Sequence, residues 1–360
     1  MHGRLISADG AEHPVTADAV QTLLDGTTPF WLDLAGFDPQ VDRLLRDTYG
    51  FHPLAIEDAE HFGQRPKLDT YDDFVLLVAY GANGTGRLVE VHCFFTGSAL
   101  VTVHHDACPA LAELAERVRR RAGPRADPVM LLYRVVDTLV DGYFPVLGAF
   151  DDEIDELEDA ILQRPTDEQL GRLFDMKRSL IALRKVVTPQ RDMFATLLAG
   201  GDAIPGMTPD AERYFRDLYD HLIRISDLVD SYRDLLTGAL DTHLSTISNR
   251  LNVVMKQLAI IATVFLPLSF LTGFFGQNFG WMVNRIGSWP VFVGAGIGLQ
   301  VAVVIVLMLL FRQRGWLSSD GTVPPASRPA RPRLARELRW RVATPVLHPR
   351  RAGSGDDPSA

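Results

Sequence analysis

Two long stretches near the C-terminal end contain no charged residue, and they constrain the fold more than any other feature of the chain. They cover residues 257–284 and 286–311, with only Arg285 between them. A helix needs about 20 apolar residues to cross a hydrocarbon core about 30 Å thick. Residues 258–275 and 290–311 are long enough and apolar enough, so we predict two membrane-spanning helices joined by a short turn on the far side of the bilayer.

The charges beside these stretches predict the orientation. Arg250 and Lys256 precede the first span, Arg312 and Arg314 follow the second, and the connecting turn carries one arginine. Because basic residues concentrate on the cytoplasmic side of membrane proteins, both termini should be cytoplasmic. Residues 1–15 have no apolar core of the kind found in signal peptides, so the domain before the spans should stay in the cytosol. We expect a multi-pass protein of the plasma or inner membrane.

The remaining composition argues against other classes of protein. The net charge of −9 argues against a nucleic acid partner. No residues are set up for covalent or acid–base catalysis, so we expect neither an enzyme nor a cofactor. The run Asp151–Asp159 holds seven carboxylates and no basic residue. It is either a solvated helix face or a region that attracts cations; a metal-dependent hydrolase would also need a nucleophile or a phosphate-binding loop, and neither is evident.

Patterns of turns and apolar residues divide the chain into segments. Strands are predicted at 29–34, 74–80, 88–95 and 99–104, and helices near 16–25, 39–49, 53–60, 109–122, 127–163, 167–198 and 208–275. The expected order is a cytosolic α/β domain (1–126), a cytosolic helical domain ending in a long stalk helix (127–256), the first transmembrane helix (257–275), an external loop (276–289), the second transmembrane helix (290–311), and a basic segment with a disordered cytosolic tail (312–360). The fold class is therefore an α+β membrane protein.

The first span carries a stripe of polar and small residues. Its members recur at alternating steps of four and three, which places them on one helix face: Asp241, Ser245, Ser248, Asn252, Met255, Ala259, Ala262, Leu266, Ser269 and Gly273. Such residues inside a bilayer face either another helix or a water-filled path. Two helices per chain cannot enclose a path, so a pore would need a ring of subunits. The spacing alone leaves tight helix packing and a pore equally open.

Three separated motifs resemble those of CorA-type magnesium transporters. The first is residues 245–278, which end in Gly276-Gln277-Asn278. The second is the segment HPLAIED at residues 52–58 followed by QRPK at 64–67, and the third is YFRDLYDH at 214–221. The likeness runs in one order from about residue 29 to residue 317.

This resemblance implies a funnel-shaped homopentamer in a lipid bilayer that moves divalent metal ions. It implies that Mg²⁺ is both the transported and the regulatory ion, that cobalt and nickel are also carried, and that no other cofactor is needed. By position, the residues that match the family's functional ones are Asp241, Asn252, Leu266, Ser269, Gly276, Gln277 and Asn278 along the pore and its mouth, Met255 and Leu258 at an apolar gate, Asp58 and Asp217 at a regulatory metal site, and Arg312 and Arg314 at the inner mouth.

The chain departs from the family pattern at the outer mouth. Gln277 replaces the methionine of the family's Gly-Met-Asn signature, and residues 279–288 contain no acidic side chain and add Arg285. These departures leave the choice of cation open, because acidic loops concentrate cations. Two alternatives therefore remain: a zinc transporter similar to the ZntB group, and a membrane-anchored metal sensor that does not conduct.

Overall fold

The computed structural model describes residues 1–26, 28–83, 86–120, 127–201, 203–277, 280, 284 and 288–316. They form two compact units, Met1–Ser248 and a second unit that begins at Asn249. Several predictions fall outside the described residues, namely Asn278, Arg285 and the tail from 318 to 360. So do two residues of Asn83-Gly84-Thr85-Gly86, which the sequence predicts to be the hairpin turn between the second and third strands.

A seven-stranded mixed sheet forms the centre of the first unit, in the order β2-β1-β3-β7-β6-β5-β4. The strands are β1 Gly3–Ser7, β2 Glu12–His13, β3 Phe30–Ala35, β4 Lys67–Thr70, β5 Val75–Ala82, β6 Leu88–Phe95 and β7 Ala99–His104. Only β3 and β7 pair in parallel, and the other neighbours are antiparallel. The four predicted strands are confirmed. β1, β2 and β4 were missed because they are short or charged and lie toward the sheet edges, where packing rather than sequence pattern selects the strand.

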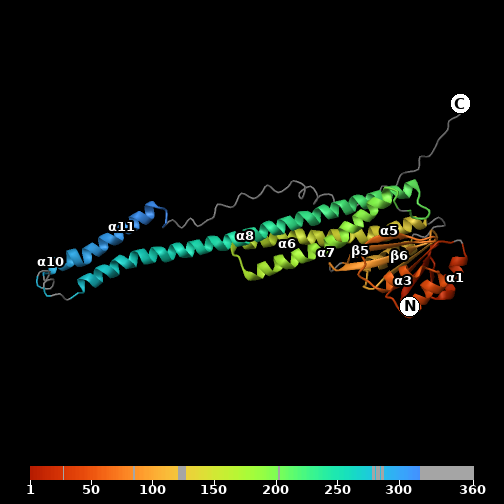
Figure 1. The fold of residues 1–360 in the computed structure, drawn as a ribbon, viewed down its shortest axis with the longest axis horizontal. Coiled ribbons are helices and arrows are strands. Elements are labelled where there is room, and N and C mark those ends of the chain that lie inside the picture. The colour runs from red at the N-terminus through yellow and green to blue at the C-terminus, as the bar shows by residue number, and fades with distance from the viewer. Residues whose placement is uncertain are drawn as a thin grey trace, which may run out of the picture. The chain divides into compact units, whose positions relative to one another are not determined.

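Helices cover both faces of this sheet (Figure 1). Every residue of β5 and β7 is buried, which requires cover on both sides. The helices of the unit are α1 Ala17–Asp25, α2 Pro39–Arg43, the π-helix η1 Leu44–Thr48, α3 Pro53–Glu60, α4 Pro109–Arg120, α5 Pro128–Asp141, α6 Tyr143–Gln163 and α7 Asp167–Leu198. The predicted helices at 16–25, 39–49, 53–60, 109–122 and 167–198 are confirmed to within a few residues.

One predicted helix, 127–163, is instead two helices that meet at Gly142. A Cβ atom built on Gly142 would lie 2.4 Å from the Ala82 carbonyl oxygen. One built on Gly81 would lie 2.7 Å from the Leu139 carbonyl oxygen. The end of α5 thus touches the end of β5 so closely that only glycine fits on either side. The break was not predicted because this contact joins segments far apart in the sequence.

The long helix α8 runs from Pro209 to Phe275, beginning in the first unit and ending in the second. Its start agrees with the prediction, since the Ala211 N–H donates to Thr208 Oγ1 at 3.1 Å and proline occupies the first helical position. In the first unit it packs on α5 and α7 through the ring contacts of Tyr133 with Tyr214 and of Phe194 with Phe215.

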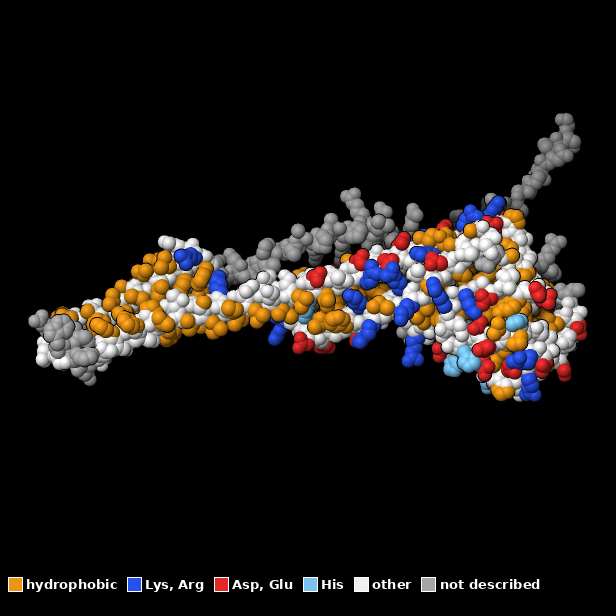
Figure 2. All heavy atoms as spheres, viewed as in Figure 1, with side chains coloured by type: hydrophobic (Ala, Val, Ile, Leu, Met, Phe, Trp, Pro, Cys, Tyr) orange, Lys and Arg blue, Asp and Glu red, His pale blue; other side chains and the backbone are white. Residues whose placement is uncertain are grey.

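The second unit contains the end of α8 and the helical segments α10 Trp289–Val291, η2 Phe292–Gly298 and α11 Leu299–Gln313. By length and composition, α8 and the stretch Trp289–Gln313 are each able to cross a membrane. Figure 2 shows apolar side chains covering this unit, whereas acidic and basic side chains are spread over the first. The chain therefore has an α/β part, a long helix and two candidate transmembrane helices.

Gln190 is the contact that ties α7 to the sheet. Its buried amide accepts a hydrogen bond from the Tyr80 N–H at 2.7 Å and donates to the Tyr80 carbonyl at 3.2 Å. The pairing of β4 with β5 ends at Val78, so the Gln190 amide takes the place of a neighbouring strand beyond that point.

We expect Gln190→Leu to destabilise the first unit by about 2 kcal/mol, because it leaves two buried backbone groups of Tyr80 without partners. The midpoint of thermal unfolding of the full-length protein in detergent measures this. Arg178→Leu, on the exposed face of the same helix, is the control and should shift the midpoint far less. Equal midpoints for Gln190→Leu and wild type would show that the amide does not tie α7 to the sheet.

Candidate functional site

The polar stripe of α8 is exposed along its whole length. Each of the ten residues predicted to share this face, from Asp241 to Gly273, is exposed in the single chain. Two large apolar residues of this face, Met255 and Leu266, have 67% and 73% of their surface exposed. Leu258, which lies beside the face, is 61% exposed. Apolar side chains left open to this degree require a covering partner or lipid.

The opposite face of α8 is partly covered within the second unit. The half-buried residues of α8 in this unit are Lys256, Ile260, Val264, Pro267, Leu268, Leu271 and Phe275. The less exposed residues of η2 and α11 also fall mainly on one face, and they are Ala295, Gly296, Gln300, Val303, Val304, Leu307 and Phe311. Gln300 Nε2 donates to Thr272 Oγ1 at 3.3 Å between the two helices. The second helix therefore lies along one side of α8 (Figure 1).

The helical repeat places the stripe on the side of α8 away from α11. At 3.6 residues per turn, Ala262, Leu266 and Ser269 lie about 140° to 200° around the helix from Val264. This part of α8 therefore has two different faces. A mainly apolar face lies against α11, and a face with amide, hydroxyl and small side chains does not contact α11. A polar face on a membrane helix must meet another helix or water.

The ends of the two helices carry the other residues implicated by the sequence. α8 ends where the Gly276 N–H donates to the Thr272 carbonyl at 2.9 Å and the Gln277 N–H donates to the Phe274 carbonyl at 3.3 Å. Both Gly276 and Gln277 are exposed. Arg312 and Arg314 are exposed at the end of α11.

Asp58 and Asp217, the predicted regulatory pair, have different neighbours in the single chain. Asp58, near the end of α3, accepts a hydrogen bond from Lys67 Nζ at 2.7 Å, and the same ammonium contacts Asp69 at 2.8 Å. Asp217 lies on α8 with 63% of its side chain exposed and 3.9 Å from His221 Nε2. The one potential metal-binding group among the described residues includes neither of these two carboxylates.

The structure instead brings three other metal-ligating side chains together. Asp137 and Asp141 on α5 and His221 on α8 place one ligand atom each within 4.8 Å of one another. His221 Nδ1 is buried and makes no hydrogen bond within the described part of the chain. The Phe144 ring and the imidazole pack nearly perpendicular to each other, with 5.8 Å between their centroids. Two carboxylates and an imidazole suit Mn²⁺, Co²⁺, Ni²⁺ or Zn²⁺ better than Mg²⁺, which prefers oxygen.

The electrostatics of this cluster favour a cation. Partial burial, together with the neighbouring Asp141 carboxylate, raises the pKa of Asp137 to about 6. Loss of hydration also raises the pKa of Asp141, although its side chain keeps contact with solvent. The Asp217 carboxylate adds to both shifts. Carboxylates that repel one another in this way are stabilised when a bound metal ion neutralises their negative charge.

Reasoning from the sequence did not find Asp137, Asp141 or the role of His221. The sequence does contain a pattern that could have indicated the cluster. Asp137 and Asp141 are one helical turn apart, and so are Asp217 and His221. Which two helices face each other was not available from that spacing. The sequence also suggests a weaker candidate, a zinc site of His104 and His105 with Cys93 and Cys108. It finds no support, because Asp137, Asp141 and His221 make the one potential metal-binding group among the described residues. His104 instead pairs with Asp33 at 3.4 Å.

Comparisons with known proteins agree on one family. The model described as "CorA-like Mg2+ transporter protein" matches residues 27–313. The "Cobalt/magnesium transport protein CorA" of Thermotoga maritima is 35% identical over 312 residues, covering 83% of this chain and 87% of that protein. The "Zinc transport protein ZntB" of Cronobacter sakazakii is 27% identical over 318 residues, covering 87% and 93%.

Solved structures share the fold. The structure titled "The complete structure of CorA magnesium transporter from Methanocaldococcus jannaschii" superimposes with a TM-score of 0.70 at 23% identity. The match covers 80% of this chain and 92% of that one. At this identity the likeness establishes the fold, and the sequence matches above establish the family.

We expect Asp137→Asn to weaken Mn²⁺ binding to the first unit at least tenfold, because the substitution removes one of three ligands. Binding to wild type should also fall between pH 7.5 and 5.5 as Asp137 takes up its proton. Metal-free Asp137→Asn should be about 1 kcal/mol more stable at pH 7.5. The sign follows because a raised pKa in the folded state means that the charged carboxylate disfavours folding above that pKa.

Electron paramagnetic resonance of free Mn²⁺ and thermal unfolding measure these two effects on the full-length protein. Asp210→Asn, a solvent-exposed carboxylate near the start of α8, is the matched control. Unchanged Mn²⁺ affinity in Asp137→Asn would show that the cluster is not a metal site.

Proposed function

Because the chain belongs to the CorA-like Mg²⁺ transporter family, it is a divalent metal transporter rather than an enzyme, and we propose that it works as a homopentameric channel for hydrated Mg²⁺. Cobalt and nickel are the other expected cargoes. Both termini are cytoplasmic in this proposal, and the ion moves inward down its electrochemical gradient. A membrane potential of 100 mV contributes about 4.6 kcal/mol for two charges.

The polar face of α8 is the observation that carries the proposal. It lies on the side of the helix away from α11, so the second transmembrane helix of the same chain does not cover it. Five copies arranged around an axis would place this face against water and put the second helices in an outer ring. Packing of small residues alone would not account for Asn252 and Ser269 on that face, because each would then need a hydrogen-bond partner inside the bilayer.

Along this axis the chemical character of the side chains changes from the inner end of the pore to its outer mouth. Asp241 attracts cations near the inner end, and Asn252 follows it. Met255 and Leu258 form an apolar constriction that closes by losing its water. Leu266 and Ser269 continue the lining toward the mouth at Gly276, Gln277 and Asn278. Amide oxygens at the mouth accept hydrogen bonds from the waters of a hydrated ion without stripping them, which suits an ion that gives up its water slowly.

Cytosolic metal closes the channel in this proposal. Asp217 and the cluster of Asp137, Asp141 and His221 lie on α5 and α8, and Asp58 of a neighbouring subunit would complete a shared site. A bound cation would relieve the repulsion among these carboxylates and favour the symmetric ring. Arg312 and Arg314, at the end of α11, would face the inner mouth and the lipid headgroups.

A zinc transporter is the second candidate, and one observation favours it. The cytosolic cluster includes an imidazole, a ligand that zinc accepts and magnesium rarely uses. Gln277 and the absence of acidic residues in the external loop are compatible with either cargo.

Ion flux into proteoliposomes distinguishes these functions. Uptake of Mg²⁺, Co²⁺, Ni²⁺ and Zn²⁺ is measured separately, with and without a pH gradient. The proposal expects Mg²⁺ uptake that depends on voltage and not on the pH gradient. Zinc uptake that needs the gradient would favour the second candidate, and no uptake of any ion would favour a sensor that does not conduct.

We expect Met255→Ser to raise Mg²⁺ uptake several-fold under high internal Mg²⁺, because a hydroxyl group lowers the free energy of wetting the constriction. Val254→Ser is the control, since its side chain is similarly exposed but lies about 100° around the helix. A fluorescent Mg²⁺ indicator inside the liposomes reports the rates. Equal stimulation by both variants would show that Met255 does not face the pore.

A further inference from the structure

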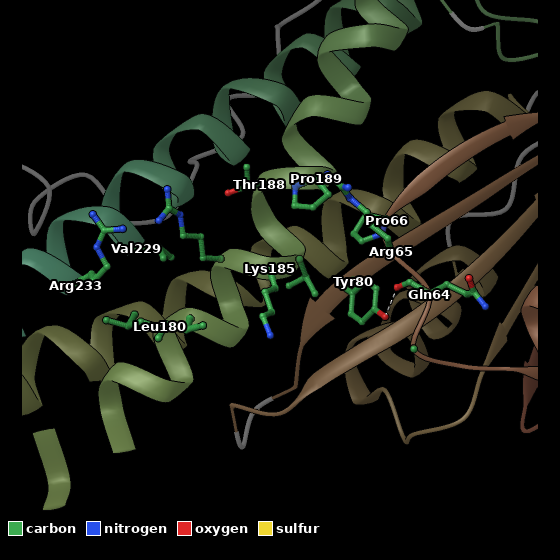
Figure 3. A pocket seen from close by; sticks show the side chains of 14 residues that line it. Gln64, Arg65, Pro66, Tyr80, Leu180, Lys185, Thr188, Pro189, Val229 and Arg233 are labelled. Carbon is green, nitrogen blue, oxygen red and sulfur yellow. Dashed lines mark hydrogen bonds between the residues drawn. The ribbon is translucent and has the colours of Figure 1, made fainter. Parts of the chain in front are cut away.

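A basic pocket lies in the first unit, away from the acidic cluster. Its volume is about 760 Å³, and it is bordered by the loop 63–66, Tyr80 of β5, one face of α7 and two residues of α8 (Figure 3). The volume is within the range of about 300 to 1,000 Å³ that is usual for small-molecule sites. None of the residues assigned above to the pore, gate, regulatory site or inner mouth lines it.

The pocket collects positive charge. Its lining includes Arg65, Arg184, Lys185 and Arg233, and no acidic side chain among the described residues lines it. Arg184 and Arg233 are partly neutralised, because Asp230 lies 3.4 Å from the first and 3.7 Å from the second. Arg65 and Lys185 make no ion pair within the described ranges, so their charge is available to a ligand.

The structure holds Arg65 in place through its backbone. The N–H groups of Gly63 and Gln64 donate to the buried Glu90 carboxylate, and His92 Nε2 contacts the same carboxylate at 2.8 Å. Burial alone would raise the pKa of Glu90, but these hydrogen bonds together lower it. The Tyr80 hydroxyl donates to the Gln64 carbonyl at 2.6 Å, as the dashed line in Figure 3 shows. An ionised, fully bonded Glu90 therefore fixes the loop that carries Arg65 at the edge of the pocket.

Most of the remaining lining of the pocket is apolar, and Gln64 and Thr188 are its polar members. The apolar part is formed by Pro66, Tyr80, Leu180, Ile181, Val186, Pro189 and Val229. In Figure 3 Lys185 and Tyr80 lie near each other at the centre, Arg65 lies beside Pro66, and Arg233 lies at the opposite end on α8. A ligand that fits must combine several negative charges with an apolar or aromatic portion. Guanidinium groups bind phosphate oxygens through paired donors, and an ammonium adds a point charge.

We propose that this pocket binds a nucleoside polyphosphate in its metal-free form. Arg65, Arg184 and Lys185 hold the phosphates, and the apolar surface around Tyr80 and Ile181 receives the base. The metal-free form is preferred because the pocket supplies cationic side chains, and no carboxylate among its described lining residues could share a bound Mg²⁺. Metal-free polyphosphate becomes more abundant when cytosolic Mg²⁺ falls, so the pocket would report magnesium shortage independently of the acidic cluster.

Isothermal titration calorimetry on the full-length protein in detergent tests the proposal. ATP is titrated in the presence of EDTA and again with excess Mg²⁺, and adenosine and inorganic pyrophosphate are titrated separately. We expect ATP with EDTA to bind at least tenfold more tightly than ATP with Mg²⁺. We also expect ATP to bind more tightly than either pyrophosphate or adenosine, because each fragment makes only part of the contacts.

Two charge-removing variants and one matched control complete the experiment. Lys185→Gln and Arg65→Gln should each weaken ATP binding at least tenfold, and their side chains are exposed, so folding should be retained. Arg178→Gln removes an arginine from the same helix outside the pocket and should leave affinity unchanged. Unchanged affinity in both pocket variants, or no binding of ATP at millimolar concentration, would overturn the proposal. The proposal would also be overturned if wild type bound no ATP and the pocket variants changed the oligomeric state. The basic residues would then form a contact between subunits.

Discussion

Inside a bilayer, a polar side chain or an exposed backbone group has no water to bond with unless the protein provides it. This constraint determines which arrangements of the second unit are possible. In a single chain, α11 covers one side of α8, and the amide, hydroxyl and small residues lie on the other side. The two helices alone cannot satisfy that polar face. The assembly must supply either more helices or a wet axis, and membership of a transporter family favours the axis.

The first unit uses its charges differently. It buries a mixed sheet between helices, and among its many charged side chains it gathers one acidic cluster and one basic pocket lining. The acidic cluster joins α5 to α8, and the basic pocket is bordered by α7, α8 and the loop after α3. Both sites therefore include residues of the helix that continues into the second unit. A ligand that binds one helical arrangement better than another shifts their populations by its difference in affinity.

Local sequence was sufficient for most helices and for the buried strands. The strands β5, β6 and β7 are rich in apolar residues and almost wholly buried, and α7 begins at a capping box in which Thr166 and Gln169 each bind the other's backbone. Local sequence was insufficient where a distant segment imposed the structure. Gly142 breaks a predicted helix because of its contact with Ala82, and Gln190 replaces a strand beside Tyr80. Neither effect has a signature in the neighbouring residues.

The sequence by itself determined the two membrane-crossing stretches, the long helix, the polar stripe and the family resemblance. These depend on composition and on the 3.6-residue repeat, which are properties of one segment at a time. Only the tertiary structure decided that α11 lies opposite the stripe, that Asp137 and Asp141 lie close to His221, and that Arg65 and Lys185 line one pocket. The physical reason is that each of these features depends on side chains from separate elements being packed close together. Spacing along the chain fixes which face of a helix a residue occupies, but packing fixes what that face touches.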